Sequence, residues 1–312
     1  MKKFLIRLLG IALCCIFALF LVELYLLRIP NRYSYKREYI ENHINDIRVL
    51  VLGNSFMEDD IVPQELGNHS FNAAISGREP VYDFELGKRY IPQMSHLEAV
   101  VMPLDYRAFA FGRERVNPRD FKKHGGSKST FKCMNYKYLH VHVDPFWYWS
   151  EILNSELNYK SRIWMPYAQQ IESDTLGTVR LQDANKNPKW EHWDLPRLYD
   201  TSVPKNQQEF DAFREGYRAL AKAAHDKGCR LILLSTPKYK TYQADVSPVV
   251  KEEMRQFVAD LRKHYPDVEY YDFELDTTFL PEDFHDAGHM SEAGAVKFSR
   301  MLRKIIGPRP SD

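Results

Sequence analysis

The sequence predicts an α/β fold built around a doubly wound parallel sheet. Five short apolar runs have the length of strands and are mostly bounded by Gly, Pro or polar residues: IRVLVLG from Ile47, HSFNAAIS from His69, LEAVVMPL from Leu97, CRLILLSTP from Cys229 and VEYYDFE from Val268. Helical patterns lie between them, over about 81–93, 207–227, 246–264 and 291–305. Strands that alternate with helices indicate a parallel sheet whose functional crevice lies at the carboxyl ends of the strands.

Residues 1–30 predict a membrane anchor, an N-terminal transmembrane helix. Basic residues stand before and within an apolar stretch that reaches Leu27, and a helix of that length is about as long as a bilayer is thick. The segment contains no convincing Ala-x-Ala site, so an uncleaved single-pass helix is favoured over a cleaved signal. Leu13 stands where a lipoprotein would need a small residue before Cys14, which favours apolar cysteines within a membrane helix.

The remaining residues, 31–312, are expected to form one α/β domain on the outer side of the membrane. Basic residues on the two sides of the helix nearly balance, so the positive-inside rule gives little preference. The very short tail before the helix favours a periplasmic or otherwise extracytoplasmic domain. Lys plus Arg number 43 against 42 Asp plus Glu, and this balance provides no field that would favour a nucleic-acid partner.

A long aromatic-rich insertion is predicted at about 107–205. It lacks a long helical pattern and contains all five tryptophans: Trp147, Trp149, Trp164, Trp190 and Trp193. Their faces could stack on sugar rings or cover an acyl chain, and a small subdomain would equally need them for a core of its own. His140 and His142 could hold a metal ion, but no third ligand is evident, and no metal or cofactor is predicted. Cys133 and Cys229 are too few for a disulfide framework.

The first candidate site residue follows the first strand pattern. This pattern stops at Gly53-Asn54-Ser55, which would place the Ser55 hydroxyl at the carboxyl edge of the sheet and at the start of a helix. Gly53 permits a tight turn, and free N–H groups at a helix start can stabilise an oxyanion. Serine is also a common helix N-cap, so the triplet alone has a second, structural interpretation.

A base and an acid for such a serine occur together near the other end of the chain, in PEDFHDAGHMSEAGAVKFS from Pro281. A serine nucleophile needs a base, and the base needs an acceptor that fixes its tautomer. His289 is the candidate base, and Asp286, three residues earlier, is the candidate acid. From spacing alone, Asp283 and His285 remain alternative candidates for the acid and the base.

These blocks resemble those of the SGNH/GDSL hydrolase superfamily. Gly53-Asn54-Ser55 is similar to the family's Gly-Asp-Ser-like block, FNAAISG to its second block, and Asp286-Ala-Gly-His289 to its final Asp-x-x-His block. The resemblance spans about 47–306, apart from the insertion, and implies a flavodoxin-like SGNH fold with a Ser-His-Asp triad. The MSEAGA continuation resembles the family's and favours His289 over His285.

The resemblance also implies an oxyanion hole formed by N–H groups of Ser55 and Gly77. One departure concerns the third block, which normally supplies an Asn donor, whereas the corresponding strand here ends VVMPLDYRAF. Asp105 cannot donate while ionised, so Tyr106, Arg107 or the backbone would have to serve. Loss of one oxyanion donor typically costs about 100- to 1,000-fold in rate. The missing Asn is therefore consistent with a slow reaction, with an enzyme specialised for acyl transfer, or with an active site that a partner completes.

The favoured function is a membrane-anchored serine esterase or O-acyltransferase that acts on acyl esters of cell-envelope glycans. An anchor joined to such a domain also resembles envelope proteins that work with membrane-bound O-acyltransferases, such as the alginate O-acetylation and lipoteichoic-acid D-alanylation proteins, and this implies a partner of that class. The alternative is a non-catalytic module that binds a glycan or a partner, which the missing Asn motivates. A secreted lipase is disfavoured by the uncleaved anchor.

Overall fold

A computed structural model describes residues 2–67, 69–106, 109, 134–141, 175–179, 207–242 and 247–307. Its centre is a five-stranded sheet in the order β2-β1-β3-β4-β5, in which every neighbouring pair is parallel. The strands are β1 (Val49–Val51), β2 (Ser70–Asn72), β3 (Ala99–Pro103), β4 (Arg230–Ser235) and β5 (Val268–Asp272). Each lies within one of the five predicted runs, so the α/β class with a parallel sheet is confirmed.

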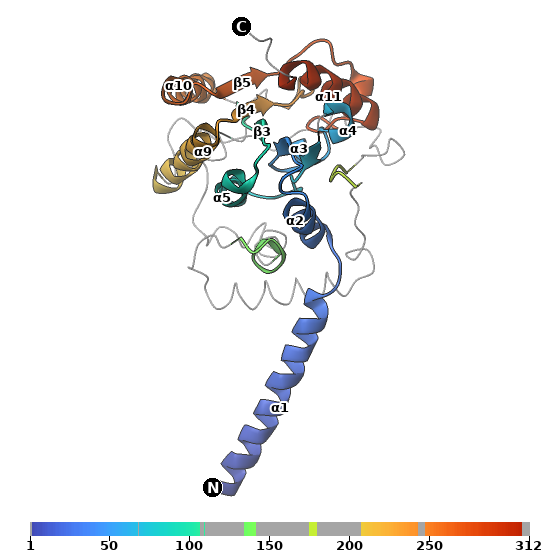
Figure 1. Ribbon diagram of the computed structural model, residues 1–312, viewed down its shortest axis with the longest axis vertical. Helices are drawn as coiled ribbons and strands as arrows, with labels where there is room; N and C mark the ends of the chain where they lie inside the picture. The colour runs from blue at the N-terminus through green and yellow to red at the C-terminus, as the bar shows by residue number, and fades with distance from the viewer. Residues whose placement is uncertain are drawn as a thin grey trace.

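Helices cover both faces of the sheet (Figure 1). Leu50, Val100 and Leu231 pack on one face, under α2 (Arg32–Asn42), α5 (Pro80–Tyr90), α9 (Gln207–Lys227) and α10 (Pro248–His264). Val49, Val101 and Ile232 pack on the other face, under α4 (Pro63–Leu66) and α11 (Glu292–Ile306). Burial of both faces explains why the strand runs are continuously apolar and do not alternate with polar residues.

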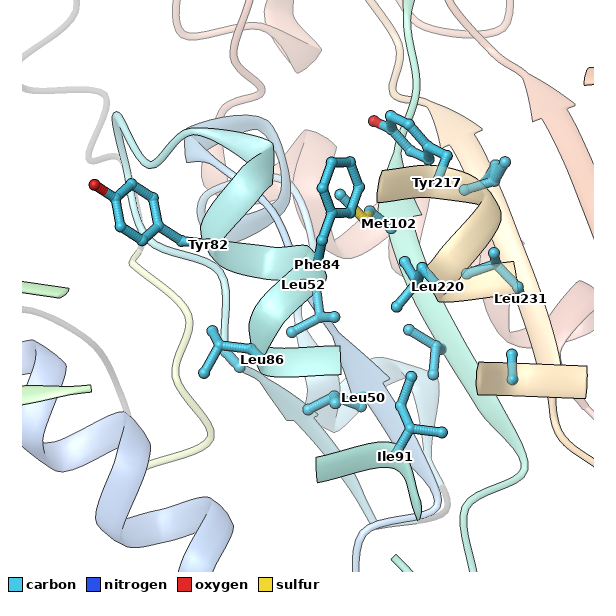
Figure 2. Packing of buried hydrophobic residues seen from close by; sticks show 14 of the residues in the cluster. Leu50, Leu52, Tyr82, Phe84, Leu86, Ile91, Met102, Tyr217, Leu220 and Leu231 are labelled. Atoms are coloured by element: carbon cyan, nitrogen blue, oxygen red, sulfur yellow. The ribbon is translucent and has the colours of Figure 1, made fainter. Parts of the chain in front are cut away.

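Buried hydrophobic side chains pack between α5, α9 and the sheet (Figure 2). The Phe84 ring of α5 meets the Tyr217 ring of α9 edge to face, with centroids 4.9 Å apart. The Tyr217 hydroxyl then donates to the Pro103 carbonyl at 2.7 Å. Helix α9 is thereby attached to the carboxyl end of β3, where the candidate site begins; the short helix η1 (Ile91–Gln93) extends α5 at the opposite end of the sheet.

Helix α1 (Lys2–Leu27) extends away from the sheet (Figure 1) and is long and apolar enough to cross a membrane, by length and composition. A membrane helix and a signal sequence share these properties. Its apolar side chains are exposed along most of its length, with Leu26 buried at its end. The Tyr138 hydroxyl donates to the Leu26 carbonyl at 3.0 Å and attaches this end of the helix to the domain.

Apolar periodicity predicts no helix directly after the anchor, yet the chain forms α2 there. The helix begins with a reciprocal cap, in which the Asn31 side chain accepts from the Ser34 N–H at 3.2 Å and the Ser34 hydroxyl accepts from the Asn31 N–H at 3.1 Å. It buries Lys36 as well as Tyr33 and Ile40. A capping box and a buried charge, rather than an apolar stripe, therefore define this helix.

Most of the predicted insertion lies outside the described residues. This applies to Arg107, Cys133, His142 and the five tryptophans, Trp147, Trp149, Trp164, Trp190 and Trp193. In the described part, the Leu176 carbonyl accepts from the Asn72 N–H at 2.9 Å, so residues 175–179 run beside the edge strand β2. His140 lies near α2, where its Nε2 is 2.8 Å from Nη1 of Arg37.

Candidate active site

The turn after β1 brings the chain very close to β3. Gly53 has a φ of +130°, and a Cβ there would lie 2.6 Å from Cδ of Pro103 and 2.7 Å from Cγ of Met57. Its N–H donates to the buried carboxylate of Asp83 at 2.9 Å. Any larger residue would be strained and would collide with its neighbours. Glycine is therefore required for the turn that brings Ser55 to the carboxyl edge of the sheet.

Ser55 begins the one-turn helix α3 (Ser55–Glu58), but Asn54 is the residue that caps it. The Asn54 side chain accepts from the Phe56 N–H at 3.1 Å. The interpretation of Ser55 as an N-cap is therefore wrong. A helix of four residues has only a small dipole, so stabilisation of an oxyanion beside Ser55 would depend on individual N–H groups.

Three side chains, two of them far from the third in the sequence, form a hydrogen-bonded line at this edge. Oγ of Ser55 lies 2.8 Å from Nε2 of His289. On the other side of the ring, Nδ1 of His289 lies 3.0 Å from each carboxylate oxygen of Asp286. A proton on Nδ1 that faces Asp286 leaves Nε2 free to accept from the serine hydroxyl. This is the order of nucleophile, base and acid that acyl transfer uses.

Backbone N–H groups hold the Asp286 carboxylate in this position. Its Oδ1 accepts from the Gly288 N–H at 2.7 Å and from the His289 N–H at 2.9 Å. Burial by itself would raise the pKa of Asp286, but the hydrogen bond and charge of His289 and these two N–H groups outweigh burial and lower the pKa to about 2. Asp286 is therefore ionised wherever a histidine base can operate.

The same pairing acts on His289 in the opposite direction. Burial alone would lower the pKa of the imidazole, but the hydrogen bond and charge of Asp286, helped by the charge of Asp60, raise it above its ordinary value. Only the neutral ring can accept the serine proton. We therefore expect kcat/KM for ester hydrolysis to fall on acidification with a midpoint above about 6.5, and Asp286→Asn to move that midpoint to lower pH.

A pH–rate profile of both proteins measures this shift, and a wild-type midpoint below the ordinary histidine value would contradict it.

The contribution of His289 to the stability of the fold has the opposite dependence on pH. Because the folded pKa is raised, this contribution is complete below the unfolded value of about 6.5 and is lost as the pH rises through the folded value.

The two rival residues have other partners. Asp283 ends the short helix η6 (Pro281–Asp283), and its Oδ2 accepts from the Leu280 N–H at 2.9 Å and from Nζ of Lys297 at 2.6 Å. His285 donates its backbone N–H to the His289 carbonyl at 2.9 Å. The structure thus brings Asp286 and His289 to Ser55, while Asp283 and His285 support the loop around them.

A glycine in the first turn of α11 allows the histidine loop to lie against this helix. A Cβ on Gly294 would be 2.0 Å from the Asp283 carbonyl oxygen, which already accepts from the Ser291 N–H at 2.9 Å. We expect Gly294→Ala to lower the free energy of unfolding by about 1–3 kcal/mol, because the helix and the Asp283 backbone must separate. Urea unfolding measures this change. Ala293→Ser, at the exposed neighbouring position, is the control, and equal stability of the two variants would contradict the prediction.

The loop after β2 lies beside α3 and forms one hydrogen bond with the turn before this helix and one with the helix itself. The Ile75 N–H donates to the Gly53 carbonyl at 3.0 Å, and the Ser76 N–H donates to the Glu58 carboxylate at 2.6 Å. Gly77, the predicted oxyanion donor, is the next residue; it is exposed and has a φ of +74°. The turn that carries Gly77 is therefore held against the helix that carries Ser55.

The described residues after β3 do not restore the missing amide donor. Asp105 is buried, and the Tyr106 hydroxyl donates to Asp272 at 2.8 Å, so this hydroxyl is already engaged. Arg107 lies outside the described residues. The backbone N–H groups of Ser55 and Gly77 therefore stay the predicted oxyanion donors.

Two buried charged pairs beside the site were not evident from the sequence. Nζ of Lys36 lies 2.7 Å from Oε1 of Glu58, and Nζ of Lys238 lies 3.6 Å from Oδ2 of Asp60; all four side chains are at most 1% exposed. A run such as MEDD usually indicates a solvated surface, and nothing in it identifies partners so distant in the chain. Within the part of the chain that the structure describes, no group of three His, Cys, Asp or Glu side chains is arranged to hold a metal ion.

No family model and no curated protein matches this chain. A solved structure described as "a putative platelet activating factor from Streptococcus pneumonia" is similar over 93% of this chain and 98% of its own, with a TM-score of 0.43 and 13% sequence identity. A likeness at this level carries no argument about function.

Proposed function

We propose that this protein is a serine esterase or O-acyltransferase of the SGNH type. The observation that carries the proposal is the contact of 2.8 Å between Oγ of Ser55 and Nε2 of His289, with Asp286 on the opposite ring nitrogen. The strand order 2-1-3-4-5 supports a flavodoxin-like SGNH fold, because it reverses at β1 and ligands of such sheets bind beside the reversal, at the carboxyl ends of the strands. Ser55 follows β1 at that edge.

In the proposed reaction, Ser55 attacks the carbonyl carbon of an acyl ester while His289 takes the hydroxyl proton. The Ser55 and Gly77 N–H groups stabilise the tetrahedral oxyanion. His289 then gives the proton to the departing alcohol, which leaves an acyl-serine. A second hydroxyl, deprotonated by His289, releases the acyl group and regenerates Ser55. Water as this second substrate gives an esterase, and a sugar hydroxyl gives a transferase.

The setting of this chemistry is proposed to be the cell envelope. Helix α1 is long and apolar enough for the single-pass anchor. The proposal further places the domain on the periplasmic or extracytoplasmic side, with acyl esters of envelope glycans as substrates and a membrane-bound O-acyltransferase as partner. Extraction of membranes at alkaline pH tests the anchor, since a peripheral or secreted protein would be released. Co-purification from detergent extracts tests the partner.

Labelling with a fluorophosphonate probe tests the activated serine. The full chain in mild detergent is compared with Ser55→Ala and His289→Ala by intact mass. We expect one adduct on the wild type and none on either variant, because the probe reacts with a serine that an adjacent base has activated. Labelling of Ser55→Ala at the wild-type rate would exclude this mechanism.

The second candidate is a non-catalytic module on the same fold that binds a glycan or a partner. It is favoured because, among the described residues after β3, no side chain replaces the Asn donor of the third block; Tyr106 is engaged with Asp272. Failure of the wild type to label, together with glycan binding that survives Ser55→Ala, would support it.

A further inference from the structure

The peptide groups on both sides of His289 are held by buried charged side chains. The Met290 N–H donates to Oδ1 of Asp60 at 2.9 Å. The Gly288 carbonyl accepts from Nζ of Lys238 at 2.6 Å. Asp60 follows α3 and Lys238 follows β4, so two elements that are remote in the sequence hold the backbone of one residue.

The two charged groups also form a pair with each other and contact the nucleophile helix. Their side chains are fully buried, with Nζ of Lys238 3.6 Å from Oδ2 of Asp60. The same ammonium donates to the Thr236 hydroxyl at 2.5 Å and lies 3.5 Å from the centre of the Phe56 ring. Phe56 directly follows Ser55, and its ring centroid is 5.0 Å from that of His289. Lys238 therefore contacts both the loop of the base and the residue beside the nucleophile.

Stability alone is a weak reason for such a pair. Replacing a buried ion pair with apolar residues of similar volume is often neutral or stabilising, because charges lose hydration on burial. Apolar residues, however, cannot form hydrogen bonds with a carbonyl oxygen and an N–H group at defined positions. The contacts with Gly288 and Met290 use this property.

We propose that Asp60 and Lys238 are a positioning pair that holds the peptides beside His289, so that its ring stays between Ser55 and Asp286. The proposal rests on the proposed function of that line of residues. Neither member touches the reacting atoms. The pair holds the base in place, and its loss should reduce kcat more than it changes KM.

The pair also has an electrostatic consequence that a purely structural support would lack. The ionisable groups that face His289 are Asp286 on its own loop, Asp59 and Asp60 after α3, and Lys238 after β4. Burial raises the pKa of Asp59 to about 8, so this carboxyl is mostly protonated at pH 7. The Asp60 carboxylate favours the protonated imidazole, whereas the Lys238 ammonium opposes it. Burial lowers the pKa of Lys238, and the charges of Asp60, Asp105, Glu274 and Asp286 oppose this shift.

The test uses Asp60→Asn and Lys238→Met in the full chain in mild detergent. Both replacements preserve approximate size, and the amide oxygen of Asn can still accept from Met290. Lys238→Met removes the donor to the Gly288 carbonyl and is expected to lose about 10- to 100-fold in kcat with less than about a threefold change in KM, since the base acts only in the transition state. Asp60→Asn keeps the acceptor for Met290 and should lose less. The acidic midpoint of the pH–rate profile should fall by about 0.5–1 unit for Asp60→Asn and rise by a similar amount for Lys238→Met.

The double variant Asp60→Asn/Lys238→Met removes both charges of the pair, so that neither is left without the other. Its midpoint should return toward that of the wild type while kcat stays low. It also provides a folded protein if Lys238→Met alone unfolds. The control is Lys297→Met, which breaks the contact of 2.6 Å with Asp283 beside the same loop and should leave kcat and the midpoint unchanged.

A readout that does not need activity separates this proposal from the proposed function. The titration of the His289 imidazole is followed by NMR, with the signal assigned by its loss in His289→Gln. Opposite shifts in the two single variants support the pair even if the wild type hydrolyses no ester. Shifts in the same direction, or unchanged titration together with unchanged kcat, would overturn the proposal.

Discussion

Ser55→Ala is expected to reduce kcat for hydrolysis of a short-chain aryl ester by about 10⁴- to 10⁶-fold. Alanine leaves no atom that can form the acyl intermediate, and His289 and Asp286 have no function in this reaction without it. The residual rate should be that of a site that only binds and polarises the ester. Steady-state release of the aryl alcohol by the full chain in mild detergent measures the effect.

The control for this experiment is Ser95→Ala, which removes an exposed hydroxyl bonded to Asn45 at 2.8 Å. It should retain wild-type kcat. If Ser55→Ala kept more than about a tenth of the wild-type rate, ester hydrolysis would not proceed through Ser55, because loss of a triad nucleophile never has so small an effect.

Lys36→Met is expected to destabilise the fold by about 3–5 kcal/mol. The lysine lies in α2, donates to the Glu58 carboxylate at 2.7 Å and also contacts the Ala74 carbonyl. Burial lowers the pKa of Lys36 to about 8 despite the charge of Glu58, so the lysine still carries its charge at pH 7. Methionine would leave Glu58 in a buried site with only Arg32, 3.3 Å away, as a cationic partner.

Thermal unfolding at pH 7 should show a midpoint lower by roughly 6–20 °C, at about 2–4 °C for each kcal/mol. Lys36→Met/Glu58→Gln should recover part of this loss, because it removes the unpaired carboxylate as well. Lys88→Met, at a lysine whose side chain is 72% exposed, serves as the control. A midpoint for Lys36→Met equal to that control would show that the buried pair contributes nothing.

The Lys36–Glu58 pair also connects α2, the helix that follows α1, to the candidate site. Glu58 belongs to the helix that begins with Ser55, and its carboxylate accepts from the Ser76 N–H beside Gly77. A soluble form of the domain should therefore begin no later than Asn31, since Asn31 caps α2 and Arg32 and Lys36 both contact Glu58.

The strands, most of the long helices and the three residues proposed as nucleophile, base and acid could be predicted from the sequence. Strands buried on both faces must be apolar along their length, and amphipathic helices must repeat every three to four residues, so both leave local patterns. Gly53 is a similar case, because a sharp turn requires the smallest residue. Asp286 and His289 could be predicted as acid and base because their spacing resembles the Asp-x-x-His block of the SGNH/GDSL hydrolases.

The contacts between distant side chains, in contrast, could be seen only in the folded structure. It placed Asn54 rather than Ser55 as the cap of α3, turned Asp283 toward Lys297 and engaged Tyr106 with Asp272. It also created the buried Lys36–Glu58 and Lys238–Asp60 pairs and helix α2, which no apolar periodicity indicates. A charged residue in a sequence carries no sign of its partner. Whether it is solvated or buried beside an opposite charge depends on segments tens to hundreds of residues away, and these come together only when the sheet is assembled.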